Sequence, residues 1–387
     1  MEQTIPSPNA GADERRERFN REPMRLAPDQ STAWHKLPKT GVSWAQAVAL
    51  VQAADAHDGE RRDVGLTKLS AYVVGPTADH TMALAHRDGV LPPTPLRETA
   101  FRQLCARIGA PSDYVAKLPG RIQAVLVDHG LRSSDIDGNL LRCAAGEARA
   151  LLSDRYAALD NSLVIGTMAE SLDKHGLLDS VKIVGLATGT STVIRCILPT
   201  DSIVVPSGVK EDDLDHLVLG FDVGNGEIGN RAVSVIGSVY RPICENGLRN
   251  VYVSDAHKLR HIGDPARLAE AFMQAVPSAL AAARGTRQKL NDSIDRMVTD
   301  ALSEIDGLRQ FGLSLTDTRD IARDVAASRG RALPDKSTAW TLGDFGPDPI
   351  RVWDVVNAAT HIAQSRGVDA RLDIEEAAGR YLDKRTK

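Results

Sequence analysis

The hydrophobic pattern of this chain changes its period near Asp255, and this change limits the folds that the chain can adopt. Between about residues 139 and 240, apolar residues alternate with polar ones in short runs, which is typical of β-strands. Beyond Asp255 the apolar residues recur at helical spacing. A run of strands followed by a run of helices predicts an α+β fold.

Three pairs of alternating runs flank short turns, so we expect them to form antiparallel hairpins. The pairs are residues 139–145 with 148–153, 181–187 with 192–198, and 216–223 with 231–240. A helix at about 162–175 separates the first two pairs and is expected to cross the sheet. The predicted architecture is therefore a central antiparallel sheet of hairpins with a crossing helix, flanked by an N-terminal helical segment and a C-terminal region of long helices.

Composition shifts and turn residues divide the rest of the chain. We expect a flexible tail at 1–30, a mainly helical segment at 31–120, the α+β core at 121–255, long helices at 256–330 and a helical segment at 331–387. Helices are predicted at about 43–56 and 101–109, and a short one at 114–118. In the long-helix region, one apolar stripe is expected to run through Leu290, Met297 and Ile305, with a kink at Pro277.

Charge and composition exclude several classes of protein. The formal net charge is −4, so no overall positive field attracts nucleic acid or anionic lipid, and any such binding needs a local patch. Long apolar runs are absent, which argues against a membrane-spanning protein. The cysteines, Cys105, Cys143, Cys196 and Cys244, are widely spaced, which favours a reducing cytoplasm.

Two motifs suggest chemistry but lack the context that it needs. Gly224-x-Gly226-x-x-Gly229 matches a phosphate-binding loop, yet a strand pattern rather than a helix follows it, so we interpret it as a hairpin turn. His257 and His261 have the spacing of zinc ligands, but no third ligand follows. No catalytic residue, metal or cofactor is predicted from these motifs.

Cations concentrate in residues 231–261, directly after an acidic stretch at 201–230. Such a stripe could follow a phosphate backbone, or it could pair with the acidic stretch beside it. Aromatic residues make up only 4% of the chain, which leaves few rings for stacking on bases. Any nucleic acid is therefore expected to be held mainly by its backbone.

Several segments resemble the phage/plasmid-like protein family that is defined by a domain of unknown function. They are Ala33-Trp34-His35, the run from Phe101 to Pro111 with Tyr114 and Leu118, Leu141-Arg142, the run from Arg149 to Tyr156 with Leu159-Asp160-Asn161, Arg241 with Cys244-Glu245-Asn246-Gly247-Leu248, and Trp353 to Thr360 with Ala378-Gly379. The family brings no established catalytic residues. Its members look like cargo of mobile elements, and the layout is similar to that of phage single-strand annealing proteins of the RecT and Red-beta kind.

The resemblance implies a non-enzymatic, self-assembling protein that binds single-stranded DNA as a homo-oligomer. The expected backbone contacts are Arg142, Arg149, Arg155, Arg231, Arg241, Arg249, Lys258 and Arg260, with Tyr156 and Tyr240 as stacking partners. Arg142 and Arg149 lie on paired strands and are expected to project to one face.

Two alternatives remain open at the level of sequence. One is an enzyme acting on nucleotides or nucleic acid, with Cys244, Glu245, Asn246, His257 and His261 near one pocket. The other is a protein-binding module that acts on a host system.

Overall fold

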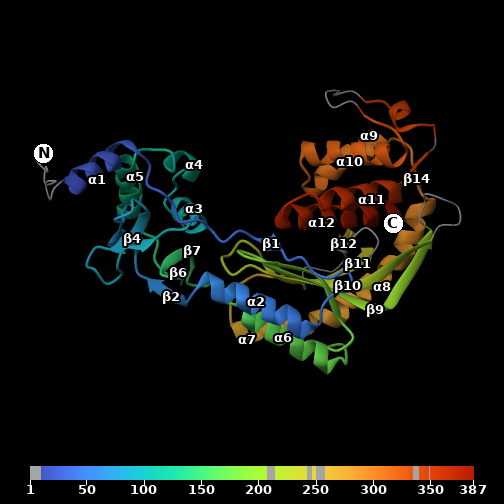
Figure 1. Ribbon diagram of the computed structural model, residues 1–387, viewed down its shortest axis with the longest axis horizontal. Coiled ribbons are helices and arrows are strands. Elements are labelled where there is room, and N and C mark those ends of the chain that lie inside the picture. The colour runs from blue at the N-terminus through green and yellow to red at the C-terminus, as the bar shows by residue number, and fades with distance from the viewer. Residues whose placement is uncertain (1–9, 207–213, 242–245, 250–257, 334–339, 348) are drawn as a thin grey trace, which may run out of the picture. The chain divides into compact units, whose positions relative to one another are not determined.

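The computed structural model describes residues 10–206, 214–241, 246–249, 258–333, 340–347 and 349–387 (Figure 1). The chain divides into two compact units. Unit 1 comprises Met1–Ser31, Ala53–Ala158 and Glu227–Asn230, and unit 2 comprises Thr32–Gln52, Leu159–Gly226 and Arg231–Lys387. The chain passes from unit 2 to unit 1 within helix α2 (Trp44–Asp58).

Unit 1 contains two small antiparallel sheets and the helices that cover them. One sheet has the strand order β2 (Arg61–Leu66), β6 (Asn139–Ala144), β7 (Glu147–Ser153), and the other has β3 (Tyr72–Pro76), β4 (Met82–His86), β5 (Thr94–Pro95). The helices are α1 (Ala10–Arg21), α3 (Glu98–Arg107), α4 (Ser112–Val115) and α5 (Gly120–Arg132). Their inward side chains, such as Phe101, Leu104 and Val127, join Leu84 and Leu141 of the strands in one core.

Unit 2 is built on a seven-stranded antiparallel sheet. Its main path is β1 (Ala33–Trp34), β8 (Lys182–Thr188), β9 (Thr192–Pro206), β10 (Leu214–Asn225), β11 (Val233–Arg241) and β12 (Asn246–Arg249), and β13 (Lys258–Leu259) also pairs with β11. Alternate residues of β9 and β10, such as Cys196 and Phe221, face a core shared with α2, α6 (Asn161–Lys174) and α8 (Ala275–Asp295). Figure 1 shows these helices on one side of the sheet, together with α7 (Pro265–Met273).

The C-terminal helices form a second core with the end of α8. They are α9 (Ala301–Asp306), α10 (Leu315–Ser328), α11 (Val352–Ala363) and α12 (Val368–Thr386). Trp353, Val356 and Tyr381 are among the residues buried there. The first half of α12 instead reaches the sheet, where Glu375 bonds to the fully buried Arg195 beside Asp222. Among the described residues, no helix has the length and apolar character needed to cross a bilayer.

The structure confirms the predicted α+β class and the three hairpins. Helix α6 forms as predicted, but it does not cross a single sheet, because it joins β7 in the small sheet of unit 1 to β8 in the large sheet of unit 2. The predicted core at 121–255 is therefore divided between the two units. The Gly224–Gly229 motif lies at the turn between β10 and β11, where Gly229 has a φ of 77°. This left-handed conformation explains a glycine in the turn.

The N-terminal predictions need two corrections. Residues 10–30 of the predicted tail are ordered, since they include α1 and bury Met24 and Ala27 in unit 1, while residues 1–9 lie outside the described part of the chain. The segment 31–120 is not mainly helical, because it carries β2 to β5. Strand β2 begins with three charged residues, Arg61 to Asp63, and buries only Leu66, so it lacks the alternation that marks a strand.

The long-helix prediction needs correction at residues 290–305. Helix α8 ends at Asp295, Met297 and Val298 pair as β14 with β15 (Ile350–Arg351), and α9 begins after Asp300. The Asp300 side chain accepts a bond from the Ser303 backbone N–H, which caps a new helix. Pro277 lies in the first turn of α8, where its missing N–H removes no helical bond, and the break falls before it at Gln274.

Candidate nucleic-acid interface

Arg142 and Arg149 lie together, as their strands predict, but inside unit 1. Arg142 is 1% exposed and Arg149 is 5% exposed. Both guanidinium groups reach Glu227: Arg149 Nη1 lies 2.9 Å from Glu227 Oε2, and Arg142 Nη1 donates to the Glu227 carbonyl oxygen at 2.8 Å. The expected backbone contacts at these two positions are therefore corrected to buried contacts within the protein.

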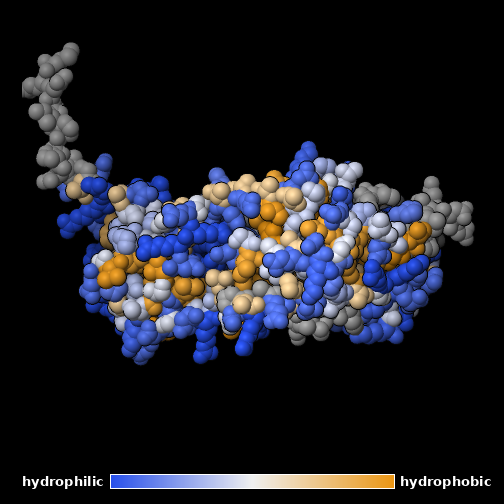
Figure 2. Space-filling model, turned by 90° about the horizontal axis from the view of Figure 1, so that it is seen from below, coloured by the Kyte–Doolittle hydropathy of each residue, from blue (hydrophilic) through white to orange (hydrophobic). Residues whose placement is uncertain are grey.

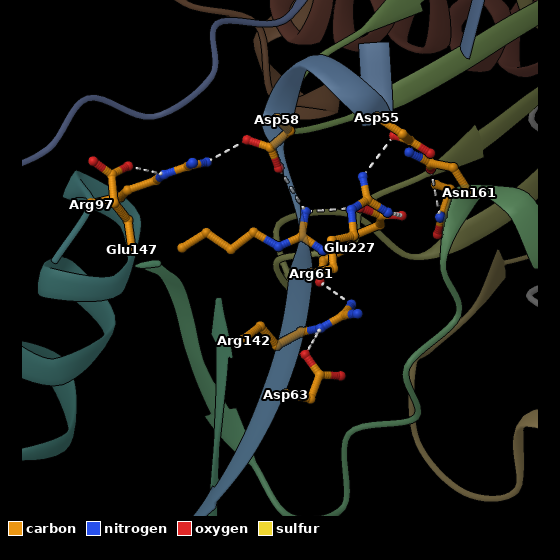
Figure 3. Close-up of polar contacts among 11 residues, drawn as sticks. Asp55, Asp58, Arg61, Asp63, Arg97, Arg142, Glu147, Asn161 and Glu227 are labelled. Carbon is orange, nitrogen blue, oxygen red and sulfur yellow. Dashed lines mark hydrogen bonds and ion pairs between the residues drawn. The ribbon is translucent and has the colours of Figure 1, made fainter. Parts of the chain in front are cut away.

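A larger network surrounds these two arginines, and we call it the buried charge cluster (Figure 3). Its members are Asp55, Asp58, Arg61, Asp63, Arg97, Arg142, Glu147, Arg149 and Glu227. Arg61 bridges Asp55 and Glu227 at 2.6 Å each, and Arg97 bridges Asp58 at 2.7 Å and Glu147 at 2.9 Å. Each arginine contacts at least one carboxylate, so the cluster holds the loop at 227–230 against β2, β6 and β7. Because these guanidinium groups are bound to protein carboxylates, they are not available to bind phosphate.

Tyr156 belongs to the same neighbourhood. The guanidinium carbon of Arg142 lies 5.9 Å from the centre of its ring, within the range of a cation–π contact. Burial raises the pKa of Tyr156 to about 12. This half-buried ring already contacts a protein cation rather than open solvent, which makes it a poor platform for a base.

The basic stretch at 231–261 is mostly paired with the C-terminal helices. Arg231 lies 2.5 Å from Asp369, Lys258 lies 2.7 Å from Glu376, and Arg241 donates to the side chain of Asn357 at 3.1 Å. Tyr240 is buried between strands against Ile197 and Val218. These residues do not form one exposed cationic stripe.

Three of the expected DNA contacts, Arg155, Arg249 and Arg260, have no ion pair in the described part of the structure. Arg155 and Arg260 are exposed. Arg249 lies on β12 opposite Ser238, and its side chain is outside the part that the structure describes.

The alternative enzyme site falls largely outside the described residues. Cys244, Glu245 and His257 are not described, Asn246 begins β12, and His261 is buried. Within the described ranges, no group of three or more His, Cys, Asp or Glu side chains is placed to hold a metal ion.

Large hydrophobic side chains reach the surface in separate groups, as Figure 2 shows for one face of the protein. One group in unit 1 lies on α4 and α5. Its members are Tyr114 (62% exposed), Ile122 (46%), Val125 (62%) and Leu126 (41%). Of the aromatic side chains that the structure describes, Tyr114 alone is mostly exposed.

Gln123 explains why Tyr114 points outward. Its fully buried amide donates to the carbonyl oxygens of Val115 and Ala116, and it accepts from the Met24 backbone N–H at 2.7 Å. These bonds fix the short helix α4 to the start of α5, with Val115 turned into the core. Tyr114, one position earlier, is left on the outside.

Exposed cations lie close in sequence to this apolar group. Lys117 and Arg121 are exposed and, among the described residues, neither has an ion-pair partner. Arg102 of α3 lies 4.0 Å from Asp113, and both side chains are mostly exposed, so the pair is weak. We call the set of Arg102, Tyr114, Lys117, Arg121, Ile122, Val125 and Leu126 the Tyr114 face.

The predicted site did not include the Tyr114 face. The sequence places Tyr114 in a predicted short helix at 114–118 and in the family resemblance, but not in the binding site. The sequence carries a signal for it, because Ile122, Val125 and Leu126 recur at i, i+3 and i+4 while Val127 and Leu131 lie on a second apolar stripe. One apolar stripe is enough to pack a helix against a core, so a second stripe on the same helix indicates an exposed apolar surface.

Comparison with family models, with curated proteins and with solved structures finds no match to this chain.

Proposed function

We propose that this protein binds single-stranded DNA without catalysing a reaction, and that the Tyr114 face of unit 1 is the contact surface. The observation that carries the proposal is the exposed Tyr114 ring on α4, with exposed Lys117 and Arg121 close to it in sequence and exposed aliphatic side chains on the next helix, α5. A single strand presents unpaired bases that stack on such a surface and phosphates that bind the cations. A duplex hides its base faces, so the single strand is preferred.

The expected mode of binding follows from the small number of rings. One tyrosine stacks on one base, and the remaining affinity comes from phosphate contacts and from apolar contact with Ile122 and Val125. Neither source reads base identity. The protein therefore binds without sequence preference.

The wider setting is also a proposal. The resemblance to phage/plasmid-like proteins supports a role in annealing or maintenance of a mobile element, with several copies assembled on one strand. Cys105, Cys143 and Cys196 are free thiols, which supports a reducing cytoplasm.

The test is fluorescence anisotropy with a labelled oligothymidine of about 20 nucleotides at about 50 mM salt, where phosphate contacts are strongest. Tyr114→Ala is expected to weaken binding by roughly 5-fold to 100-fold, the range that loss of one stacked base gives. Val90→Ala is the matched control, because it removes an exposed side chain outside the face.

A second pair of variants separates the two candidate sets of cations. Lys117→Glu with Arg121→Glu should abolish binding, while Arg155→Glu with Arg260→Glu should leave it within about 2-fold. Absence of saturable binding by the wild-type protein would overturn the proposal, and so would equal losses in the two double variants.

A protein partner is the second candidate, and the aliphatic stripe Ile122, Val125 and Leu126 favours it. A pull-down from host lysate, with and without nuclease, tests this possibility. Capture of a protein that survives nuclease treatment and is lost in Val125→Asp would support a protein-binding module acting on a host system.

A further inference from the structure

Unit 2 has a cavity between α9 and α10 that the proposed function does not use. Its volume is about 240 Å³. Leu302 and Ile305 of α9 and Leu315 and Ala322 of α10 form its apolar walls. Thr318 also lines the cavity. Its hydroxyl donates to the Leu315 carbonyl oxygen, so it needs no hydrogen-bond acceptor from a ligand.

The size of the cavity sets the size of its ligand. An engineered apolar cavity of about 150 Å³ in another protein holds benzene. A cavity of about 240 Å³ therefore has room for an aromatic ring and several further atoms.

Trp340 supplies an aromatic wall. The guanidinium carbon of Arg323 lies 5.8 Å from the centre of a Trp340 ring, and Arg323 is not among the residues that line the cavity. The Trp340 indole therefore lines the cavity and is held in place by Arg323, which lies outside it. An aromatic ligand gains stacking or edge contacts against such a wall.

Two charges of opposite sign complete the lining, Asp306 and Arg319. Arg319 has no ion-pair partner among the described residues. Asp306 lies 3.4 Å from Arg309, and both side chains are more than half exposed, so a ligand cation can compete for this carboxylate. An anion and a cation beside one apolar cavity select a ligand that carries both charges.

We propose that this cavity binds an aromatic α-amino acid. The ring lies against Trp340 and the apolar walls, the carboxylate binds Arg319 and the ammonium group binds Asp306. The site belongs to unit 2 and does not depend on the Tyr114 face, so either proposal can fail without the other.

Calorimetric titration of the full-length protein with three probes tests the proposal. L-Phenylalanine carries both charges, 3-phenylpropionate lacks the ammonium group and phenethylamine lacks the carboxylate. We expect L-phenylalanine to bind about tenfold more tightly than either analogue, since each charged contact contributes about one factor of ten.

Variants assign each contact. Arg319→Gln should remove the advantage of L-phenylalanine over phenethylamine, and Asp306→Asn should remove its advantage over 3-phenylpropionate. Arg287→Gln and Glu270→Gln, which change exposed residues away from the cavity, should alter neither ratio. Ala322→Phe should abolish binding of all three probes by filling the cavity.

Two results would overturn the proposal. One is no saturable binding of L-phenylalanine at millimolar concentration. The other is binding whose preference among the three probes stays the same in Arg319→Gln and Asp306→Asn. Asp306 is exposed and Arg319 is half-buried, so we expect these variants to keep the fold, and the test does not depend on Ala322→Phe.

Discussion

Arg149 and Arg155 are close in sequence but have opposite environments. Arg149 is buried between Asp58 and Glu227, whereas Arg155 is exposed just after β7. The sequence alone does not indicate whether an arginine is buried or exposed. The difference arises because residues far along the chain, here Asp58 and Glu227, provide carboxylates that offset the cost of burying Arg149.

Replacement of Arg149 tests this assignment. Arg149→Met leaves Asp58 and Glu227 with less compensation, so we expect the free energy of unfolding to fall by about 3–5 kcal/mol. Arg155→Met, the matched control, should change it by less than about 0.5 kcal/mol. Urea denaturation followed by circular dichroism measures both. Equal stability of the two variants would return Arg149 to the list of candidate DNA contacts.

The buried thiols give a pH-dependent prediction. Burial raises the pKa of Cys105 and of Cys143 to about 11, and that of Cys196 well above its usual value. At pH 8 these groups are protonated in the folded protein and react slowly, because the thiolate is the nucleophile. A Cys244→Ser variant should therefore resist Ellman's reagent until urea unfolds it.

The same shifts fix how stability responds to alkali. The folded pKa of each thiol is raised, so its contribution to stability is complete below the unfolded pKa of about 8.5 and is lost as pH rises toward 11. Rapid labelling of Cys105 and Cys143 at pH 8 in native buffer would contradict the raised pKa values on which this pH dependence is based.

At the scale of elements, the hairpins and long helices could be predicted because their signals are local. Alternation and turn glycines mark β6 to β11, and the apolar stripe of α8 spans several turns. Strands β2 to β5 and helix α1 could not be predicted in this way. Strand β2 begins with three charged residues and does not alternate, and α1 packs in unit 1 through contacts such as Gly120 beside Phe19 that no local pattern encodes.

Two glycines test the packing of α8 on the sheet. A Cβ on Gly237 of β11 would lie 2.3 Å from the Ala279 carbonyl oxygen of α8, whereas a Cβ on Gly285 of α8 meets nothing within 4 Å. Gly237→Ala should therefore destabilise the protein by about 1–3 kcal/mol through overpacking. Gly285→Ala should stabilise it by about 0.5–1 kcal/mol, since alanine is the better helix former. Thermal unfolding measures both, and opposite signs are required.

At the scale of the whole molecule, the net charge of −4 indicates that DNA binding needs a local cationic patch, but it does not indicate where in the fold that patch lies. A local cationic patch was expected, but its location depends on which cations the fold neutralises. Arg231 and Lys258 meet Asp369 and Glu376, more than a hundred positions away in sequence. Lys117 and Arg121 meet no such carboxylate among the described residues, and exposure of this kind is a property of the folded chain.

The remaining cations determine how DNA binding should depend on salt. If Arg102, Lys117 and Arg121 each neutralise one phosphate, the logarithm of affinity should fall with the logarithm of salt concentration with a slope of about −2, given about −0.7 per contact on a single strand. Raising salt from about 50 to about 200 mM should then weaken binding by about 20-fold. Lys117→Gln with Arg121→Gln should reduce the slope to about −0.7, while Tyr114→Ala should lower affinity with the slope unchanged, because stacking releases no counterions. Anisotropy titrations at four salt concentrations measure the slopes, and a steep slope that survives the double variant would place the phosphate contacts elsewhere on the protein.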